Sequence, residues 1–395
     1  FALPGGYIYI TRQLVALTNS EAEMAGVLGH EVGHTAARHS EKRKNNATLA
    51  GLLGMGGSIL GAVLGNSGGL LGALGGGLQQ YAGPLAQVFT LKYSRTQEEE
   101  ADDYGIRYLS KAGYDPSALA SMLYSLALQT SVDTQVAGLA DNRVPEWAST
   151  HPDPARRVSR AASRSKSYPA STLRNADAHL AAIDGMLYGD DPAQGVVEGQ
   201  NFLHPILKMQ FAAPYGFGMQ NSSDSVAING NSGKAIFTGG AFDGNRSSYI
   251  AKALKAVSGD NATIPSGEIR RTTVNDIPAF YSNSVVDTQQ GQRVVTVFAY
   301  EWAPDMAYHF VTITAGNANP FDRMFASMSR LTAAQASAVK PRKLRIITAG
   351  SQDNVASLAA RMAYPSLQTE RFRALNGLSS NATIRAGQKL KIVTY

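Results

Sequence analysis

The motif His30-Glu31-Val32-Gly33-His34 constrains this chain more than any other feature of its sequence. It lies in a segment that Asn19 or Ser20 can cap, and that predicts a helix from about residue 20 to about residue 40. Two histidines four positions apart share one helix face, so both imidazoles can reach one metal ion. The glutamate beside the first histidine can then act as a general base on water. The motif therefore predicts a hydrolytic zinc site.

The third zinc ligand has to be His, Asp or Glu, because the chain contains no cysteine. His39 lies about half a turn out of phase with His30, and we predict a solvated residue at the helix end. The acidic helix expected over residues 94–112 is a better source. Glu98 and Asp102 lie four positions apart on one face, so one can bind zinc while the other orients a ligand histidine. The alternative for these acids is an exposed helix start, which the macrodipole favours.

Four motifs follow one another in the first 116 residues. They are Ala2-Leu3-Pro4-Gly5-Gly6-Tyr7-Ile8-Tyr9-Ile10, then His30 to His34, then Ser94-Arg95-x-x-Glu98-x-x-Ala101-Asp102, then Gly113-Tyr114-Asp115-Pro116. In this order they resemble the HtpX, BepA and LoiP group of zinc metallopeptidases, over roughly residues 1–165. The resemblance implies that His30, His34 and Glu98 bind one zinc ion, that Glu31 is the base, and that Asp102 supports a ligand histidine.

A further motif of this group matches Ser149-Thr150-His151-Pro152-Asp153-Pro154-Ala155-Arg156-Arg157. The resemblance implies that His151 can occupy the fourth zinc position and keep the enzyme latent. A histidine on a surface loop is the alternative. Arg156 or Arg157 can stabilise the oxyanion of the reaction, or be an exposed charge of the helix that Pro154 begins.

Residues 6–11 predict a short strand, because they are rich in β-branched and aromatic residues after a turn. The matching segment of the resembling group is the edge strand of the active site. This implies that Gly6, Tyr7, Ile8 and Tyr9 hold an extended substrate by main-chain hydrogen bonds. Such binding favours unfolded polypeptides. The alternative is an ordinary core strand.

Residues 45–91 carry no charge, and residues 51–77 are mostly Gly, Leu, Ala and Met. The stretch connects the two helices that supply the metal ligands, so we predict that it lies near the cleft as a helical hairpin or lid. Membrane contact is the alternative, because the stretch is long enough to span a bilayer and contains small residues every fourth position. Its many glycines weaken a helix in water.

Changes in residue composition along the sequence divide the chain into three units. We predict a multidomain α+β fold in which residues 1–190 form a mainly α-helical zincin domain that is incomplete at its N-terminus. Residues 195–335 form an antiparallel α+β domain of unknown role, with a closing helix over residues 320–332. Within the first unit, a helix is expected from residue 115 to about 130, followed by a loop to residue 153.

Residues 342–395 form a third unit of strand, helix, helix and strand. The segments Asn354–Ala359, Phe372–Leu378 and Ile384–Ile392 resemble a LysM module. Residues 340–395 hold 10 basic and 2 acidic residues, whereas the first 339 residues hold 26 and 28. This distribution argues against a nucleic-acid partner and suits an anionic cell wall. Peptidoglycan binding and a basic packing module without a sugar ligand both stay open.

Taken together, the sequence predicts a zinc-dependent endopeptidase with one zinc ion per chain. Its expected location is the bacterial cell envelope, either periplasmic or membrane-associated, and its expected substrates are unfolded or misfolded envelope polypeptides. The alternative is a cell-wall-associated chaperone or assembly factor with a latent metal site. The two differ in whether Glu31 is needed for activity.

Overall fold

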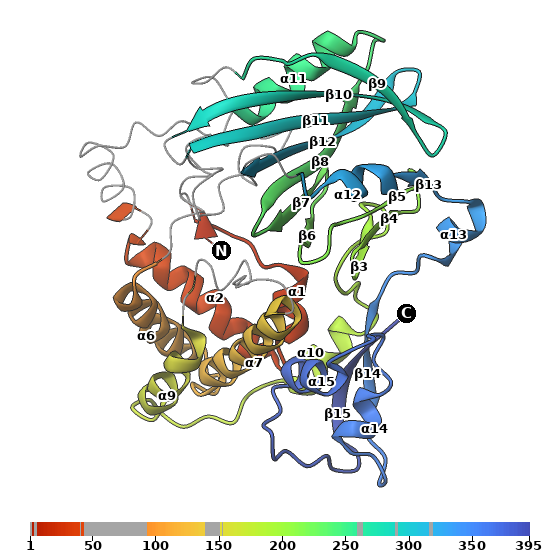
Figure 1. Cartoon of the computed structure of the whole chain (residues 1–395). Helices are drawn as coiled ribbons and strands as arrows, with labels where there is room; N and C mark the ends of the chain where they lie inside the picture. The colour runs from red at the N-terminus through yellow and green to blue at the C-terminus, as the bar shows by residue number, and fades with distance from the viewer. Residues whose placement is uncertain are drawn as a thin grey trace.

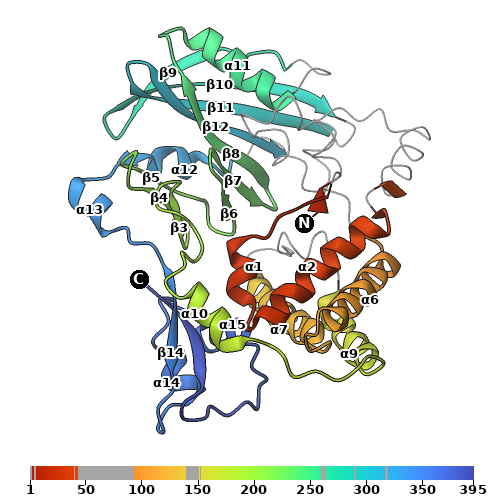
Figure 2. The ribbon, with the colours of Figure 1, turned by 180° about the vertical axis from the view of Figure 1, so that it is seen from behind.

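The computed structural model describes residues 2–3, 6–39, 41–42, 93–138, 151, 153–258, 264–288, 291–315 and 319–395. A group of helices from the first half of the chain lies apart from a large antiparallel sheet formed by the middle of the chain (Figure 1). The C-terminal unit returns to the first group and lies beside it in both views (Figures 1 and 2). The multidomain α+β fold expected from the sequence is confirmed.

The first unit is helical apart from one small hairpin. Strand β1 (Ala2–Leu3) pairs antiparallel with β2 (Tyr7–Ile8). The helices are α1 (Arg12–Leu17), α2 (Glu21–Ala36), α6 (Arg95–Lys111), α7 (Ala118–Gly138), α9 (Pro154–Ser165) and α10 (Ala176–Ile183). Ser20 caps α2 by accepting a hydrogen bond from the Glu23 amide, and Ser94 caps α6 through a capping box with Gln97.

Two boundaries in this unit differ from the sequence prediction. The strand expected over residues 6–11 is only Tyr7–Ile8, because Thr11 caps α1 and begins a helix there. The helix expected to end near residue 130 continues to Gly138. Residues 45–91 lie outside the described residues, and the lid and membrane predictions for them stay untested. No helix that the structure describes combines the length and the apolar character needed to cross a bilayer.

Helices α2 and α6 approach each other closely because glycines line their contact. A Cβ added to Gly33 would lie 2.8 Å from Tyr104 Cβ and 3.0 Å from the Ala101 carbonyl oxygen. A Cβ on Gly105 of the opposite helix would lie 3.2 Å from the His30 amide nitrogen. Backbone atoms on both sides leave no space for larger side chains. This contact brings the acidic face of α6 against the histidines of α2.

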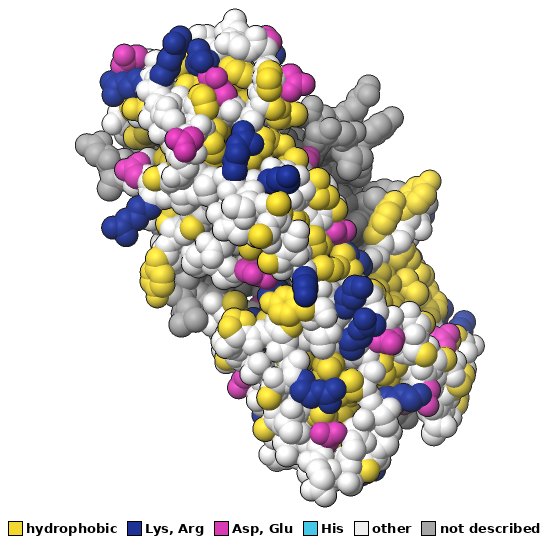
Figure 3. Space-filling model, turned by 90° about the vertical axis from the view of Figure 1, so that its right-hand side faces the viewer, with side chains coloured by type: hydrophobic (Ala, Val, Ile, Leu, Met, Phe, Trp, Pro, Cys, Tyr) yellow, Lys and Arg dark blue, Asp and Glu magenta, His cyan; other side chains and the backbone are white. Residues whose placement is uncertain are grey.

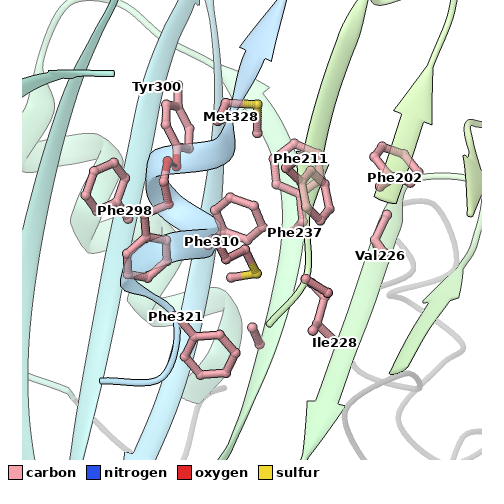
Figure 4. Close-up of a cluster of buried hydrophobic side chains, with 14 of the residues drawn as sticks. Phe202, Phe211, Val226, Ile228, Phe237, Phe298, Tyr300, Phe310, Phe321 and Met328 are labelled. Carbon is pink, nitrogen blue, oxygen red and sulfur yellow. Dashed lines mark hydrogen bonds between the residues drawn. The ribbon is translucent and has the colours of Figure 1, made fainter. Parts of the chain in front are cut away.

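The middle unit contains a seven-stranded and a four-stranded antiparallel sheet, in the orders β6-β7-β8-β12-β11-β10-β9 and β13-β5-β4-β3. Their strands are β3 (Val196–Glu198), β4 (Asn201–His204), β5 (Met209–Ala212), β6 (Gly218–Asn221), β7 (Ser225–Gly230), β8 (Gly233–Ala241), β9 (Ile269–Val274), β10 (Ile277–Thr288), β11 (Gly291–Ala303), β12 (Met306–Ala315) and β13 (Ser329–Arg330). Aromatic side chains, among them Phe211, Phe237, Phe298 and Phe310, fill one core (Figure 4). Helix α11 (Arg246–Ser258) covers a second core on the larger sheet.

The closing helix predicted over residues 320–332 is wrong in length. Helix α12 is only Asp322–Ser327, and the chain then extends into β13, which pairs with β5. Residues Ala333–Ala338, which lie beyond that predicted helix, form the short helix α13. Thr332 and Gln335 begin this helix with a capping box that the sequence reading overlooked.

The C-terminal unit has the predicted order of strand, helix, helix and strand. Its elements are β14 (Lys343–Thr348), α14 (Val355–Ala359), α15 (Gln368–Asn376) and β15 (Lys389–Thr394). The two strands pair antiparallel. Lys and Arg side chains are spread over its outer face, with hydrophobic side chains between them (Figure 3). The charge is thus distributed and does not form one continuous patch on this face.

Candidate metal centre and active site

Helix α2 presents His30 and His34 on one buried face, one turn apart. The two Nε2 atoms lie 3.0 Å apart, and the side chains are 6% and 1% exposed. A ring of Tyr93 stacks on the His34 imidazole with centroids 3.7 Å apart. The histidines therefore meet at one point, as the four-residue spacing predicts.

Helix α6 adds a carboxylate to this point. Glu98 is fully buried, and its Oε1 lies 3.3 Å from His34 Nε2, while its Oε2 lies 3.7 Å from His30 Nε2. Asp102, one turn further along, reaches the other side of the first histidine, with its Oδ1 3.0 Å from His30 Nδ1. A carboxylate on Nδ1 orients the imidazole so that its Nε2 faces the centre.

His151 completes a group of four donors. Its Nδ1 lies 2.9 Å from Glu98 Oε1 and 3.3 Å from His30 Nε2, and the ligand atoms of His30, His34, Glu98 and His151 all lie within 4.8 Å of one another. Four nitrogen and oxygen ligands at zinc's usual bond lengths stand about 3.4 Å apart in a tetrahedron. Three imidazoles and one carboxylate at these spacings fit zinc in donor type and in arrangement.

The electrostatics of the cluster favour a neutral His34 beside an ionised Glu98. Burial lowers the pKa of His34 to about 3, which keeps its lone pair free for a metal at neutral pH. Burial alone raises the pKa of Glu98, but His151, His34 and Arg157 outweigh that effect and hold it well below the usual value. His34 and Glu98 thus have the protonation states that metal binding requires. Burial lowers the pKa of His151, but the carboxylates of Glu98 and Glu31 outweigh that effect and raise it.

Glu31 lies beside this group without belonging to it. Its carboxylate is 5% exposed, and Oε1 lies 3.5 Å from His151 Nε2. Burial raises the pKa of this carboxyl, and the neighbouring His151 and His30 more than offset it, so that the net shift is downward. An ionised carboxylate next to the metal donors can take a proton from water.

Arg157 lies behind the donors and contacts the carboxylates of Glu98 and Asp102. From helix α9 its Nε and Nη2 donate to Asp102 at 2.8 and 2.6 Å, and its Nη1 donates to Glu98. The guanidinium is buried, so the alternative of an exposed helix charge is wrong. A charge held by both carboxylates is suited to fix them in place.

His39 is not the solvated residue that the sequence predicts. Helix α2 ends at Ala36, and Arg38 adopts a left-handed conformation (φ 54°) that turns the chain back. His39 is consequently fully buried, with its Nδ1 2.9 Å from His34 Nδ1 and its Nε2 3.1 Å from Glu100. A glycine at position 38 would have predicted a left-handed turn here, whereas an arginine does not.

The β1–β2 hairpin lies against α2 near the centre. Within the described residues, β2 pairs with β1 on one side only. Tyr7 and Tyr9 are 64% and 48% exposed. Gly6 precedes it with a positive φ of 88° and no atom near the position of a Cβ. Among the residues that the structure describes, the segment thus has one edge without a paired strand, on a hairpin that contacts the helix of the two histidines.

A His-Glu-x-x-His helix, a carboxylate on a second helix and a general base beside them define the class of metallopeptidases. In agreement, residues 1–165 match Peptidase family M48, and residues 348–393 match the LysM domain. The chain therefore carries an M48 metallopeptidase domain and a C-terminal LysM domain, which confirms the two resemblances read from the sequence.

Three relatives illustrate the similarity. A β-barrel assembly-enhancing protease of Yersinia pestis is 33% identical over 225 residues, which are 56% of this chain and 44% of that protein. The protein of the same name from Escherichia coli K12 is 30% identical over 42% of this chain and 31% of its own length. The mitochondrial metalloendopeptidase OMA1 of Arabidopsis thaliana is 32% identical over 38% of this chain and 26% of its own length. The matches span less than half of each relative.

Proposed function

We propose that this chain is a zinc-dependent endopeptidase of the bacterial envelope that cleaves unfolded or misfolded polypeptides. The observation that carries the proposal is the convergence of His30, His34 and Glu98, with Glu31 beside them. The names of the bacterial relatives and the LysM domain support a place in the envelope. The edge of β2 that has no paired strand among the described residues supports extended, unfolded substrates.

In the proposed mechanism, His30, His34 and Glu98 hold one zinc ion. When bound, zinc polarises the scissile carbonyl and lowers the pKa of a water molecule. Glu31 takes a proton from the water and delivers it to the leaving amine nitrogen. Asp102 orients His30 through Nδ1, and Arg157 holds Asp102 and Glu98. Arg157 contacts both carboxylates, and we therefore assign it a positioning role and not the oxyanion role expected from the sequence.

His151 adds a regulatory element to the proposal. Its Nδ1 lies beside the donor atoms of His30 and Glu98, and in a zinc-loaded centre it would compete with water for the fourth ligand position. With His151 in this place the centre has four protein donors and is closed, as structural zinc sites are. We therefore propose that His151 keeps the peptidase latent until it moves away. The same contact favours the second candidate, a cell-wall-associated chaperone whose metal site is latent.

One experiment separates the two candidates. In the zinc-loaded full chain, Glu31→Gln should lower the rate of unfolded-casein cleavage about 100- to 10,000-fold while zinc content stays the same. Glu41→Gln, an exposed site beyond the same helix, is the control and should leave the rate unchanged. His151→Ala should raise the rate. Cleavage that survives in Glu31→Gln with zinc bound would refute the peptidase, and an unchanged rate in His151→Ala would refute the latch.

We further propose that the LysM domain binds peptidoglycan. A groove of about 360 Å³ opens in it, lined by Asp353, Asn354, Val355, Ala356, Thr369, Arg373, Ala382, Thr383 and Ile384. Thr383→Trp in the full chain should abolish sedimentation with peptidoglycan, whereas Ser351→Trp, outside the groove, should not. Binding that both variants retain at low salt and lose at moderate salt would reduce the interaction to charge alone.

A further inference from the structure

The LysM domain shares its core with the peptidase domain. Ala16 of α1 and Leu180 and Ile183 of α10 lie in one buried cluster with Phe372, Leu390 and other side chains of the C-terminal unit. A unit of about 50 residues buries too little apolar surface to be very stable alone. Helix α1 of the peptidase domain and helix α10, which follows the matched residues 1–165, therefore add buried side chains to the core of the LysM domain.

The small sheet of the LysM domain also gains backbone partners. The segment that follows α10 runs antiparallel to β14: Gly185 N–H donates to the Leu344 carbonyl at 2.9 Å, and Tyr188 N–H donates to the Arg342 carbonyl at 2.8 Å. In between, Leu344 N–H donates to the Met186 carbonyl at 2.8 Å. A two-stranded ribbon alone is marginal in water, so this third segment stabilises it. The middle domain is thereby inserted between residues 188 and 342.

Lys391 of β15 connects the LysM domain to the start of the metal-binding helix. The side chain is fully buried, and Nζ donates to the carbonyls of Ala16, Leu17 and Thr18 at 2.7, 3.0 and 2.7 Å. These are the carbonyls at the end of α1, which have no partner within the helix. Three acceptors match the three N–H donors of an ammonium group.

The turn that Lys391 holds leads directly into α2. Asn19 follows Thr18, and its amide N–H donates to Glu23 Oε2 at 2.7 Å in the first turn of α2. Burial lowers the pKa of Lys391, while the Glu23 carboxylate opposes that fall. On the far side Gly377 (φ 59°) lies so close that an added Cβ would be 2.9 Å from Ser125 Oγ of α7. The turn is thus enclosed by LysM residues and by α7.

We propose that the LysM domain is an internal support of the peptidase domain, and that Lys391 positions the turn from which the metal-binding helix α2 begins. This inference does not rest on the proposed function. The groove remains available in this arrangement, because Asn354, Ala356 and Thr383 are exposed. A glycan bound there would therefore be held at a fixed position relative to the peptidase domain, because the LysM domain does not move independently.

The first test compares two lysines of one strand in the full chain. Lys391→Met keeps the length of the side chain but leaves three buried carbonyls without a donor. We expect the midpoint temperature to fall by several degrees, and hydrogen exchange of α1 and of the first turn of α2 to accelerate at least about tenfold. Lys389→Met, at an exposed position two residues earlier, should change neither. Equal behaviour of the two variants would overturn the positioning role.

The second test works even if Lys391→Met fails to fold. A protease site is inserted after Ala338, at the end of the exposed α13, and the folded full chain is cut there. The LysM fragment should co-elute with the remainder in gel filtration at native salt and separate only in denaturant. A LysM fragment that elutes alone without denaturant would overturn the proposal, whatever the peptidase activity of the chain.

Discussion

Two clusters of buried charge lie along the same helix, and they are built in opposite ways. At the C-terminal half of α2, three imidazoles and Glu98 bring their ligand atoms within 4.8 Å of one another. At its N-terminal turn, the Lys391 ammonium faces three carbonyls and lies near Glu23. The first cluster brings together lone pairs that can bind a metal cation. In the second cluster the Lys391 ammonium is the cation, and the carbonyls are its ligands.

This difference distinguishes a cluster that can bind a metal ion from a cluster that only stabilises the fold. Unpaired buried acceptors are costly, so a convergence of them persists only if something else binds there or if a strong network holds it. Arg157 supplies part of that network through its hydrogen bonds to Asp102 and Glu98. In the Lys391 cluster each N–H has one carbonyl, and nothing remains to bind. Variants of the first cluster should therefore change metal affinity, and variants of the second should change stability with or without metal.

The largest effect is expected for Glu98→Gln. The amide has nearly the shape of the carboxylate but lacks the negative charge, and it brings an N–H2 group to the imidazole nitrogens. Zinc affinity of the full chain should fall by more than the ~100-fold that loss of an outer partner can cause. Isothermal titration of the metal-free protein measures this directly.

The matched control is Glu99→Gln, one residue further along α6. Glu99 forms only partly exposed ion pairs with Arg156 and Arg160, so its loss should leave zinc affinity within about twofold and stability within about 1 kcal/mol. If Glu98→Gln binds zinc as well as Glu99→Gln does, Glu98 is not a ligand and the comparison of the two clusters fails.

The next largest effect is expected for Arg157→Lys. An ammonium cannot reproduce the fork that bonds Asp102 through two nitrogens and Glu98 through a third. Zinc affinity should fall about 10-fold, as for other second partners of metal ligands. Arg160→Lys on the same helix, whose side chain is partly exposed and pairs with Asp103, should leave zinc affinity unchanged. A loss of stability without any loss of metal affinity would assign Arg157 to the scaffold alone.

Local spacing was enough to predict most of the candidate centre. His30, His34, Glu98 and Asp102 each lie four positions from a partner on a helix, and the 3.6-residue period places such pairs on one face. A capping residue marked where α2 begins. The order of strand, helix, helix and strand in the LysM domain was also predicted, together with its resemblance to a LysM module.

The features that the sequence did not predict depend on contacts between distant segments. His39 reaches His34 through a left-handed turn at Arg38, a residue that rarely adopts one. Lys391 donates to backbone carbonyls that lie more than 370 positions away in the sequence. From the sequence alone it was one more charge of the basic C-terminal unit. The lengths of α7 and α12 were also misjudged, because tertiary packing and pairing with β5 decide where those elements end.

The smallest of these effects is expected for Gly33→Ala, which tests how closely α2 must approach α6. The new Cβ would stand 2.8 Å from Tyr104 Cβ and 3.0 Å from the Ala101 carbonyl oxygen, so the helices have to separate by a few tenths of an ångström. Overpacking of this kind costs about 1–3 kcal/mol, from which the higher helix propensity of alanine recovers up to ~1 kcal/mol. Because separation moves Glu98 away from His34, zinc affinity should fall about threefold to tenfold. The free energy of unfolding should fall by a net ~1–2 kcal/mol.

Gly26→Ala is the control on the same helix. Its Cβ would meet the flexible end of Leu109 at 3.3 Å, far from the donors, and neither the zinc affinity nor the free energy of unfolding should change much. If Gly33→Ala lowers stability but leaves zinc affinity intact, the donor geometry does not depend on the α2–α6 spacing, and the His34 side chain adjusts on its own.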